Sequence, residues 1–444
     1  MRTVQTTDYR MPLLYAAMAL ALILVGVFQS WTVALAIFNL CMISAIMALG
    51  VNIQWGYAGL FNVGIMGFAA LGGSAAIIVS MPPVTEAWEV GWQGLGLAAL
   101  MLVITIAAAI ALRRYYSGPG RNILTAVIII AGYFAIRYFA DPATDAIEAV
   151  NPTSQGYLGG LGLPVMLSWI VGGLFAAAAA YLIGRVALGL RSDYLAIATL
   201  GISEIILAVL KNENWLTRGV KNVTGIPRPV PNELELQRSE WFANLAVQLD
   251  MPVTVLSSIA VRGAFAVIFI IVLVLIMILC ERALNSPWGR MMRAIRDNRD
   301  SAAAMGKDIT GRHLQVFVLG SAVVGIAGAM LVTLDGQFTP TTYIPLRYTF
   351  LIWVMVIVGG SGNNFGAVLG GFVIWFVWIQ AEPAGLWLMR TITDTFTFGP
   401  AMQSHLVDSA PHLRMLLMGA ILLTVMRFSP RGLIPEKSAA KPLP

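Results

Sequence analysis

The chain has 444 residues, of which 58% are hydrophobic and only 11% are charged. Soluble domains carry about 25% charged residues, so this chain cannot cover a surface that faces water on all sides. Its mean hydropathy of +0.79 indicates a membrane protein instead. Cys41 and Cys280 each lie inside an apolar run, which predicts neither a disulfide framework nor a metal site.

Apolar runs near the length that crosses a hydrocarbon core of ~30 Å recur along the chain. We expect spans at 11–28, 31–49, 64–80, 94–112, 122–140, 164–183, 194–210, 262–280, 313–334, 347–358, 366–380 and 413–427. No alternating pattern of a β-barrel is visible, so each span should be a helix. The sequence therefore predicts an all-α, polytopic transmembrane bundle of about 10–12 spans, with residues 1–444 forming one domain.

The pair 347–358 and 366–380 is short and is joined by a glycine-rich segment, 358–366. It forms either two crossings or a re-entrant hairpin buried in protein, and the sequence leaves both open. The sidedness of the later segments is the same in either case.

Lysine and arginine predict the orientation. With the N-terminus inside, the inner segments carry 18 of these residues and the outer loops carry 6. This bias predicts that both termini and the loop 281–312 are cytoplasmic, whereas the long loop 211–261 is periplasmic. The net charge of +6 is then an orientation signal, and we expect no nucleic-acid partner.

Two glycine-rich stretches, 56–73 and 359–371, indicate either close helix packing or helices broken around a substrate site. Glu204 lies near the middle of a span, where an ionisable residue is either a structural polar link or a substrate contact. The candidate substrate-pathway residues are Asn52, Trp55, Gly56, Gly59, Asn62, Glu204, Gly360 and Asn363.

The sequence lacks the common motifs of nucleotide-binding, metal-binding and catalytic sites. The chain has no G-x-x-x-x-G-K-[ST], no H-E-x-x-H, no C-x-x-C and no G-x-S-x-G. We therefore expect no catalytic residue, no metal site and no cofactor bound by this chain. The protein is predicted not to be an enzyme.

The loop 281–312 predicts two short helices. Ser286 can cap the first, with Pro287 at its first position, and Asn298 or Asp300 can start the second, which Gly306 can end. Its arginines could meet an acidic partner or lipid headgroups, and its alanine run suits a groove on another protein. An ordinary basic inner loop explains the same composition about as well.

Five stretches in order resemble the LivM-type branch of the branched-chain amino acid ABC transporter permeases. They are 55–64 (WGYAGLFNVG), 190–206 (LRSDYLAIATLGISEII), the loop 289–306, 358–366 (VGGSGNNFG) and 430–433 (PRGL). The resemblance implies the permease subunit of an ATP-driven importer in a bacterial inner membrane. Amino acids, branched-chain or related, or small polar solutes such as urea or amides would be its cargo.

The resemblance also implies partners: a second, LivH-type permease, two cytoplasmic ATPases that use the ATP, and a periplasmic substrate-binding protein. The loop would then couple to an ATPase, through Gly289, Arg290, Arg293, Ala294, Arg296, Ala302, Ala303 and Gly306. Regions 82–165, 230–261 and 382–412 look longer than in typical members. The alternative is an ion-coupled secondary transporter with Glu204 as the coupling site.

Overall fold

The structure is a computed structural model that describes residues 9–153, 155–396 and 399–436. Within these residues, ten helical segments are long and apolar enough to cross a membrane. They are α1 (Arg10–Phe28), α2 with its π-helical continuation (Trp31–Tyr57), α4 (Thr85–Tyr115), α5 (Arg121–Ala149), α6 (Val165–Ala187), α7 (Ser192–Asn212), α11 (Val253–Asn285), α14 (Ile309–Asp335), α16 (Asn364–Thr395) and the α17–α18 segment (Pro400–Phe428). This confirms the all-α, polytopic prediction.

Two shorter apolar helices, α3 (Ile65–Ser80) and α15 (Pro345–Gly359), account for the remaining predicted spans. The α17–α18 segment comprises α17 (Pro400–Asp408), η3 (Ala410–His412) and α18 (Leu413–Phe428). The described chain also has short elements: α8 (Asn214–Thr217), β1 (Val223–Thr224), α9 (Glu233–Arg238), α10 (Glu240–Gln248), α12 (Pro287–Asp297), α13 (Arg299–Ala304), β2 (Gln337–Phe338) and η2 (Pro340–Thr342). The long helices often extend past the predicted spans, as α11 does at both ends.

Helices α2, α3, α6 and α14 form the centre of the bundle, and α11, α15 and α16 pack around them. Glycine makes the closest crossings possible. A Cβ at Gly328 of α14 would lie 2.0 Å from the Ala69 carbonyl oxygen of α3, and one at Gly72 would lie 2.1 Å from the Gly325 carbonyl oxygen. The two backbones therefore touch with no room for a side chain.

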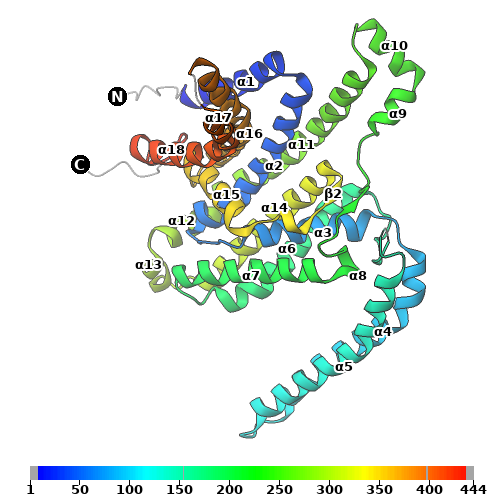
Figure 1. The fold of residues 1–444 in the computed structure, drawn as a ribbon. Coiled ribbons are helices and arrows are strands. Elements are labelled where there is room, and N and C mark those ends of the chain that lie inside the picture. The colour runs from blue at the N-terminus through cyan, green and yellow to red at the C-terminus, as the bar shows by residue number, and fades with distance from the viewer. Residues whose placement is uncertain (1–8, 154, 397–398, 437–444) are drawn as a thin grey trace.

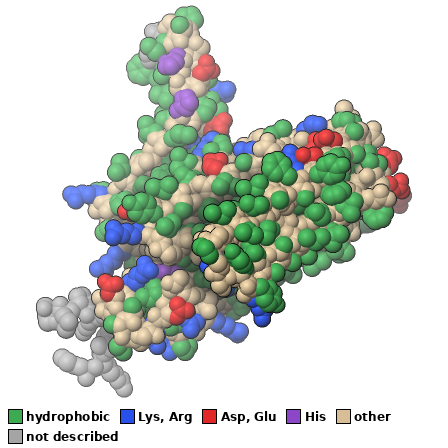
Figure 2. Space-filling view, turned by 90° about the horizontal axis from the view of Figure 1, so that it is seen from below, with side chains coloured by type: hydrophobic (Ala, Val, Ile, Leu, Met, Phe, Trp, Pro, Cys, Tyr) green, Lys and Arg blue, Asp and Glu red, His purple; other side chains and the backbone are tan. Residues whose placement is uncertain are grey.

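The bundle has two distinct ends (Figure 1). At one, Val223 of β1 pairs antiparallel with Phe338 of β2, which joins two predicted outer loops; we call this the β1–β2 end. At the other, the α12–α13 end, the Leu433 N–H donates to the Val358 carbonyl oxygen at 2.8 Å. Segments predicted to lie on one side of the membrane thus meet at one end of the molecule. Figure 2 shows Lys and Arg side chains gathered mainly toward the left, the α12–α13 end, with hydrophobic side chains over much of the rest.

Two helix breaks face each other near the α12–α13 end. Helix α2 (Trp31–Val51) continues as one π-helical segment, η1 (Asn52–Tyr57), and the chain is then non-helical up to α3. Helix α15 ends before Gly360, whose φ is +120°. For 347–380, α16 has 32 residues and is long enough to cross, whereas the choice between two crossings and a re-entrant hairpin depends on α15. At 15 residues, α15 is about 22 Å long and falls short of a full crossing.

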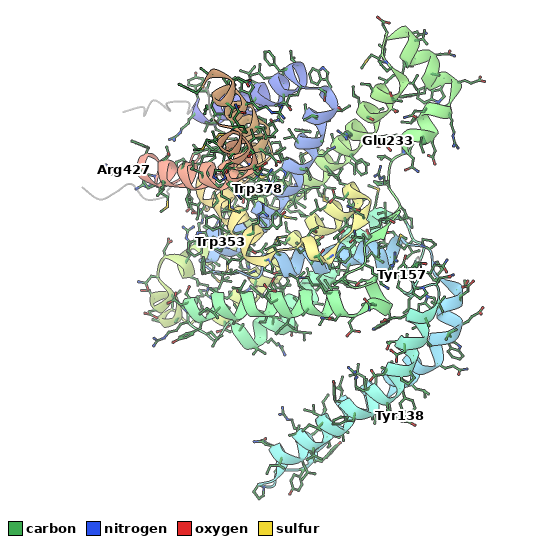
Figure 3. All side chains as sticks on the ribbon, in the orientation of Figure 1. Tyr138, Tyr157, Glu233, Trp353, Trp378 and Arg427 are labelled. Atoms are coloured by element: carbon green, nitrogen blue, oxygen red, sulfur yellow. The ribbon has the colours of Figure 1, made fainter. Side chains whose placement is uncertain are left out.

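Three peripheral elements correspond to the regions that looked longer in sequence. Helices α4 and α5 form an antiparallel hairpin that packs mostly on itself and leans away from the bundle, as Tyr138 in Figure 3 illustrates. Helices α9 and α10 project at the β1–β2 end. The third peripheral element, in the region 382–412, consists of the second half of α16 together with α17.

Candidate functional site

The local prediction for the connecting loop is confirmed. The Ser286 side chain accepts from the Gly289 N–H and caps α12, and the Asn298 side chain accepts from the Ser301 N–H at 2.9 Å and caps α13. Gly306, with a φ of +73°, follows the end of α13. Helices α11 and α14 extend into the predicted 281–312 segment, so the connection itself is only 286–308.

Helix α12 is fastened to the bundle by one apolar face. Met292 and Ile295 are fully buried, whereas Arg290 and Ala294 are exposed. A Cβ at Gly289 would lie 2.2 Å from the Leu284 carbonyl oxygen, so α12 sits directly against the end of α11. On α13, Ala302 is buried and Ala303 is exposed. The exposed surface of this connection therefore includes Arg290 and Ala294 of α12 and Ala303 of α13.

Two arginines of α12 are bonded within the chain. Arg296 lies 3.0 Å from Glu436 and donates to the Gly56 carbonyl oxygen in η1, and Arg293 lies 3.9 Å from the same carboxylate. Arg290 instead is exposed and donates to the Asn285 carbonyl oxygen at 3.1 Å. The α12 helix is thereby tied to a helix break and to the C-terminal segment.

The two breaks are locked together by buried amides. The Asn52 side chain donates to Asn364 Oδ1 at 3.0 Å and accepts from the Gly362 N–H at 2.8 Å. Tyr57 also donates to Asn364 Oδ1, and the Asn364 amide donates to Glu281 at 2.9 Å. Because buried polar groups without partners are costly, this network specifies one arrangement of the breaks.

A second set of contacts surrounds Asn62. Its amide donates to Gln54 Oε1 at 2.9 Å, and its carbonyl oxygen accepts from the Trp353 indole at 3.0 Å. The Trp55 and Trp353 rings lie 5.0 Å apart, edge to face, and Trp353 is labelled in Figure 3. Seven predicted pathway residues thus lie around the two breaks: Asn52, Trp55, Gly56, Gly59, Asn62, Gly360 and Asn363. Their role in a pathway stays a prediction.

Glu204, the eighth candidate pathway residue, lies away from the two helix breaks. It is exposed on the outward face of α7, while its neighbour Ser203 is buried against Gly67 of α3. Within the described chain it forms no hydrogen bond or ion pair. A carboxyl group in the middle of a membrane span that faces outward is costly in lipid.

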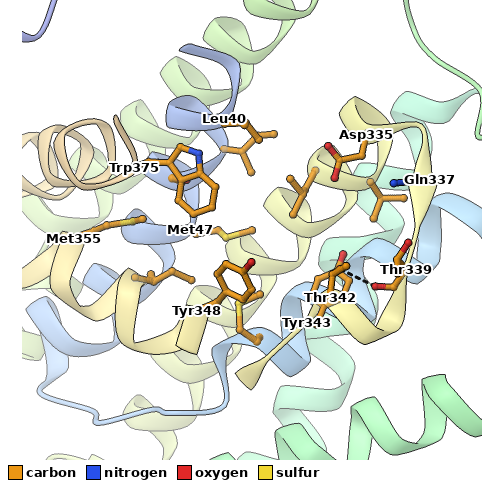
Figure 4. Close-up of a pocket in the computed structure, with 16 residues that line it drawn as sticks. Leu40, Met47, Asp335, Gln337, Thr339, Thr342, Tyr343, Tyr348, Met355 and Trp375 are labelled. Atoms are coloured by element: carbon orange, nitrogen blue, oxygen red, sulfur yellow. Dashed lines mark hydrogen bonds between the residues drawn. The ribbon is translucent and has the colours of Figure 1, made fainter. Parts of the chain in front are cut away.

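A cavity of about 290 Å³ lies between α2, α14, α15 and the segment after β2 (Figure 4). None of the predicted pathway residues lines it. Its polar side is formed by Asp335, Gln337, Thr339, Thr342 and Tyr343. Burial, and secondly the charge of Asp335, raise the pKa of the Tyr343 hydroxyl, which therefore stays protonated.

The remaining wall of the cavity is apolar, with Ile43 and Met47 from α2 and Ile352 and Met355 from α15. The sequence did not predict this cavity. The available signal was the polar run from Asp335 to Tyr343 directly after a span, which looked like an ordinary outer loop.

Ten described helical segments that can cross a membrane, with glycine-mediated crossings and two facing helix breaks, are the features of a multi-pass membrane protein. A family model described as "Branched-chain amino acid transport system / permease component" matches residues 33–426. The chain therefore belongs to the branched-chain amino acid transport permease family, which confirms the resemblance.

Named relatives agree with this family. The chain is 25% identical to a probable branched-chain amino acid transport permease protein LivM of Methanocaldococcus jannaschii, over 89% of this chain and 92% of the relative. It is 27% identical to the high-affinity branched-chain amino acid transport system permease protein LivM of Escherichia coli, over 60% of this chain and 56% of the relative. A probable LivH permease protein of M. jannaschii is 28% identical over 41% of this chain and 50% of the relative. No solved structure matches the chain.

Proposed function

We propose that the chain is the permease subunit of an ATP-driven importer that carries amino acids, branched-chain or related, with urea and short amides as other candidate cargo. The observation that carries the proposal is the link from α12 through Arg296 to the helix break at Gly56. The names of the relatives, which specify branched-chain amino acid transport, support the cargo class.

In this proposal the exposed Ala303 side of α13 seats in a groove on a cytoplasmic ATPase, and α12 transmits the movement. Arg293 and Arg296 would not reach the ATPase, because they bond Glu436 and Gly56 inside the chain. Nucleotide would bind to the ATPase alone, since this sequence has no phosphate-binding loop.

The same proposal predicts how the protein is oriented in the membrane. The α12–α13 end, with both termini, would face the cytoplasm of a bacterial cell across its inner membrane, in line with the excess of lysine and arginine there. The β1–β2 end, with α9 and α10 in the long loop 211–261, would face a periplasmic binding protein. A second, LivH-type permease would complete the membrane part, together with two ATPases.

Co-purification tests this assembly. The tagged full-length chain, isolated in mild detergent from its own cells, should bring down a second permease and an ATPase, identified by mass. Ala303→Glu should lose the ATPase and keep the second permease, because a charge enters the proposed groove. Recovery of the chain alone from membranes that contain both candidate partners would contradict the proposal and favour a single-chain transporter.

A further inference from the structure

We propose that the cavity beside Asp335 binds an amino acid in transit, with the ammonium group on Asp335 and an aliphatic side chain in the apolar part. This inference rests on the proposed function and adds to it a site within the permease. The cavity extends from the β1–β2 end of the molecule toward its middle, between α2, α14 and α15.

Asp335 is placed to attract a cation. It is the last residue of α14, where the partial negative charge of the helix end disfavours a carboxylate and favours a positive group. Its side chain is exposed and forms no hydrogen bond or ion pair with another described residue. Arg228 is close enough to act on it electrostatically, but its guanidinium pairs with Glu233 at 3.4 Å. An ammonium group that enters the cavity would replace water at this exposed carboxylate and bond it directly.

Donors for a carboxylate lie beside Asp335. The Thr339 hydroxyl is buried and has no hydrogen-bond partner among the described residues. The neighbouring Thr342 hydroxyl donates to the Thr339 carbonyl oxygen at 2.8 Å, which fixes this turn (Figure 4). Together with the Gln337 amide, the free hydroxyl can bind the carboxylate of a zwitterion whose ammonium is on Asp335.

The rest of the cavity fits an aliphatic side chain. Its 290 Å³ corresponds to about ten water molecules, which is room for a small amino acid. Met47 and Met355 form flexible apolar walls that adapt to branched shapes. A second carboxylate, as in glutamate, would enter this apolar part without a counter-charge, which costs free energy.

Protection of an introduced thiol tests the site. The full-length chain, with Cys41→Ala and Cys280→Ala to remove native thiols, carries Ser44→Cys in the cavity wall. In lipid nanodiscs, L-leucine should slow modification of this thiol. L-Glutamate should not, and neither should 4-methylpentanoate, which is leucine without its amino group. Met47→Cys repeats the measurement should the first variant fail to fold.

Asp335→Asn should raise the concentration of L-leucine needed for protection at least about tenfold, since a charge-assisted bond is lost. Asp250→Asn, an exposed carboxylate at the same end of the bundle, should leave it unchanged. The proposed site is overturned if L-leucine protects the thiol at the same concentration with and without Asp335→Asn. It is also overturned if L-leucine protects neither the Ser44→Cys thiol nor the Met47→Cys thiol.

ATP-driven uptake by the complete importer separates the two proposals. Protection without any such uptake would overturn the proposed function and leave the site standing. Uptake without protection would overturn the site alone.

Discussion

The Arg296 guanidinium on α12 donates a hydrogen bond to the carbonyl oxygen of Gly56, which lies in the π-helical break after α2. Single π-helical turns inside a helix are rare and occur often at functional sites. The contact joins α12, which is proposed to transmit movement from the ATPase seated on α13, to the helix break at Gly56. It is a direct mechanical connection between two segments that lie 240 residues apart.

Replacing Arg296 should uncouple ATP hydrolysis from substrate uptake. We expect Arg296→Ala to reduce ATP-driven uptake about tenfold, because a coupling free energy between sites is of the order of 1–3 kcal/mol. ATP hydrolysis by the assembled importer should continue. Arg290→Ala is the matched control, since its side chain is exposed and bonds only locally to Asn285. Equal losses of uptake and hydrolysis would instead indicate failed assembly.

Glu204 should lie against the second permease. A carboxylate at the centre of a span costs about 2.5–3.5 kcal/mol in lipid, so a polar group of the partner is expected to cover it. Glu204→Leu should lower co-purification of the second permease, and Glu204→Gln should retain it through the amide. Ile205→Leu on the same exposed face is the control. Unchanged recovery with Glu204→Leu would mean that α7 faces lipid.

The crossing of α3 and α14 should not tolerate a side chain. Gly328→Ala places a Cβ 2.0 Å from the Ala69 carbonyl oxygen, so the helices must separate, at a cost of about 1–3 kcal/mol. Thermal unfolding of the purified protein, followed by tryptophan fluorescence, should show a lower midpoint. Gly201→Ala should not, because nothing lies within 4 Å of its added Cβ.

The α4–α5 hairpin should be dispensable for folding. Pro83 and Gly159 form a β-bridge, and the Val84 N–H donates to the Leu158 carbonyl oxygen at 3.1 Å, so a short glycine–serine linker can close the gap. We expect the shortened chain to insert in membranes and run as a single species in size-exclusion chromatography. Aggregation would show that the hairpin stabilises the bundle.

The helices themselves could be predicted from sequence for a physical reason. A long apolar run in lipid must satisfy its own backbone hydrogen bonds, and a helix does this within the segment. All twelve predicted spans correspond to helices, and the break after Val51 was indicated by the polar Asn52–Trp55 run and the glycines that follow.

Which way a side chain faces could not be predicted. Leu207 is buried and Ile205 is exposed on the same helix, yet both are apolar, because lipid demands no polar outer face. Arginine composition likewise could not show that Arg296 bonds a carbonyl oxygen inside the chain. The cavity combines α2, α14 and α15, and its mostly apolar residues carry no local signal.

Uptake by the reconstituted importer distinguishes ATP-driven transport from transport driven by an ion gradient. The chain is placed in proteoliposomes with its co-purified permease and ATPase, and the binding protein and radiolabelled L-leucine are added on the opposite side from the ATPase. We expect accumulation of L-leucine that requires ATP and the binding protein and that persists when ion gradients are collapsed. Accumulation by this chain alone, driven by a proton or sodium gradient and abolished by Glu204→Gln, would contradict this expectation.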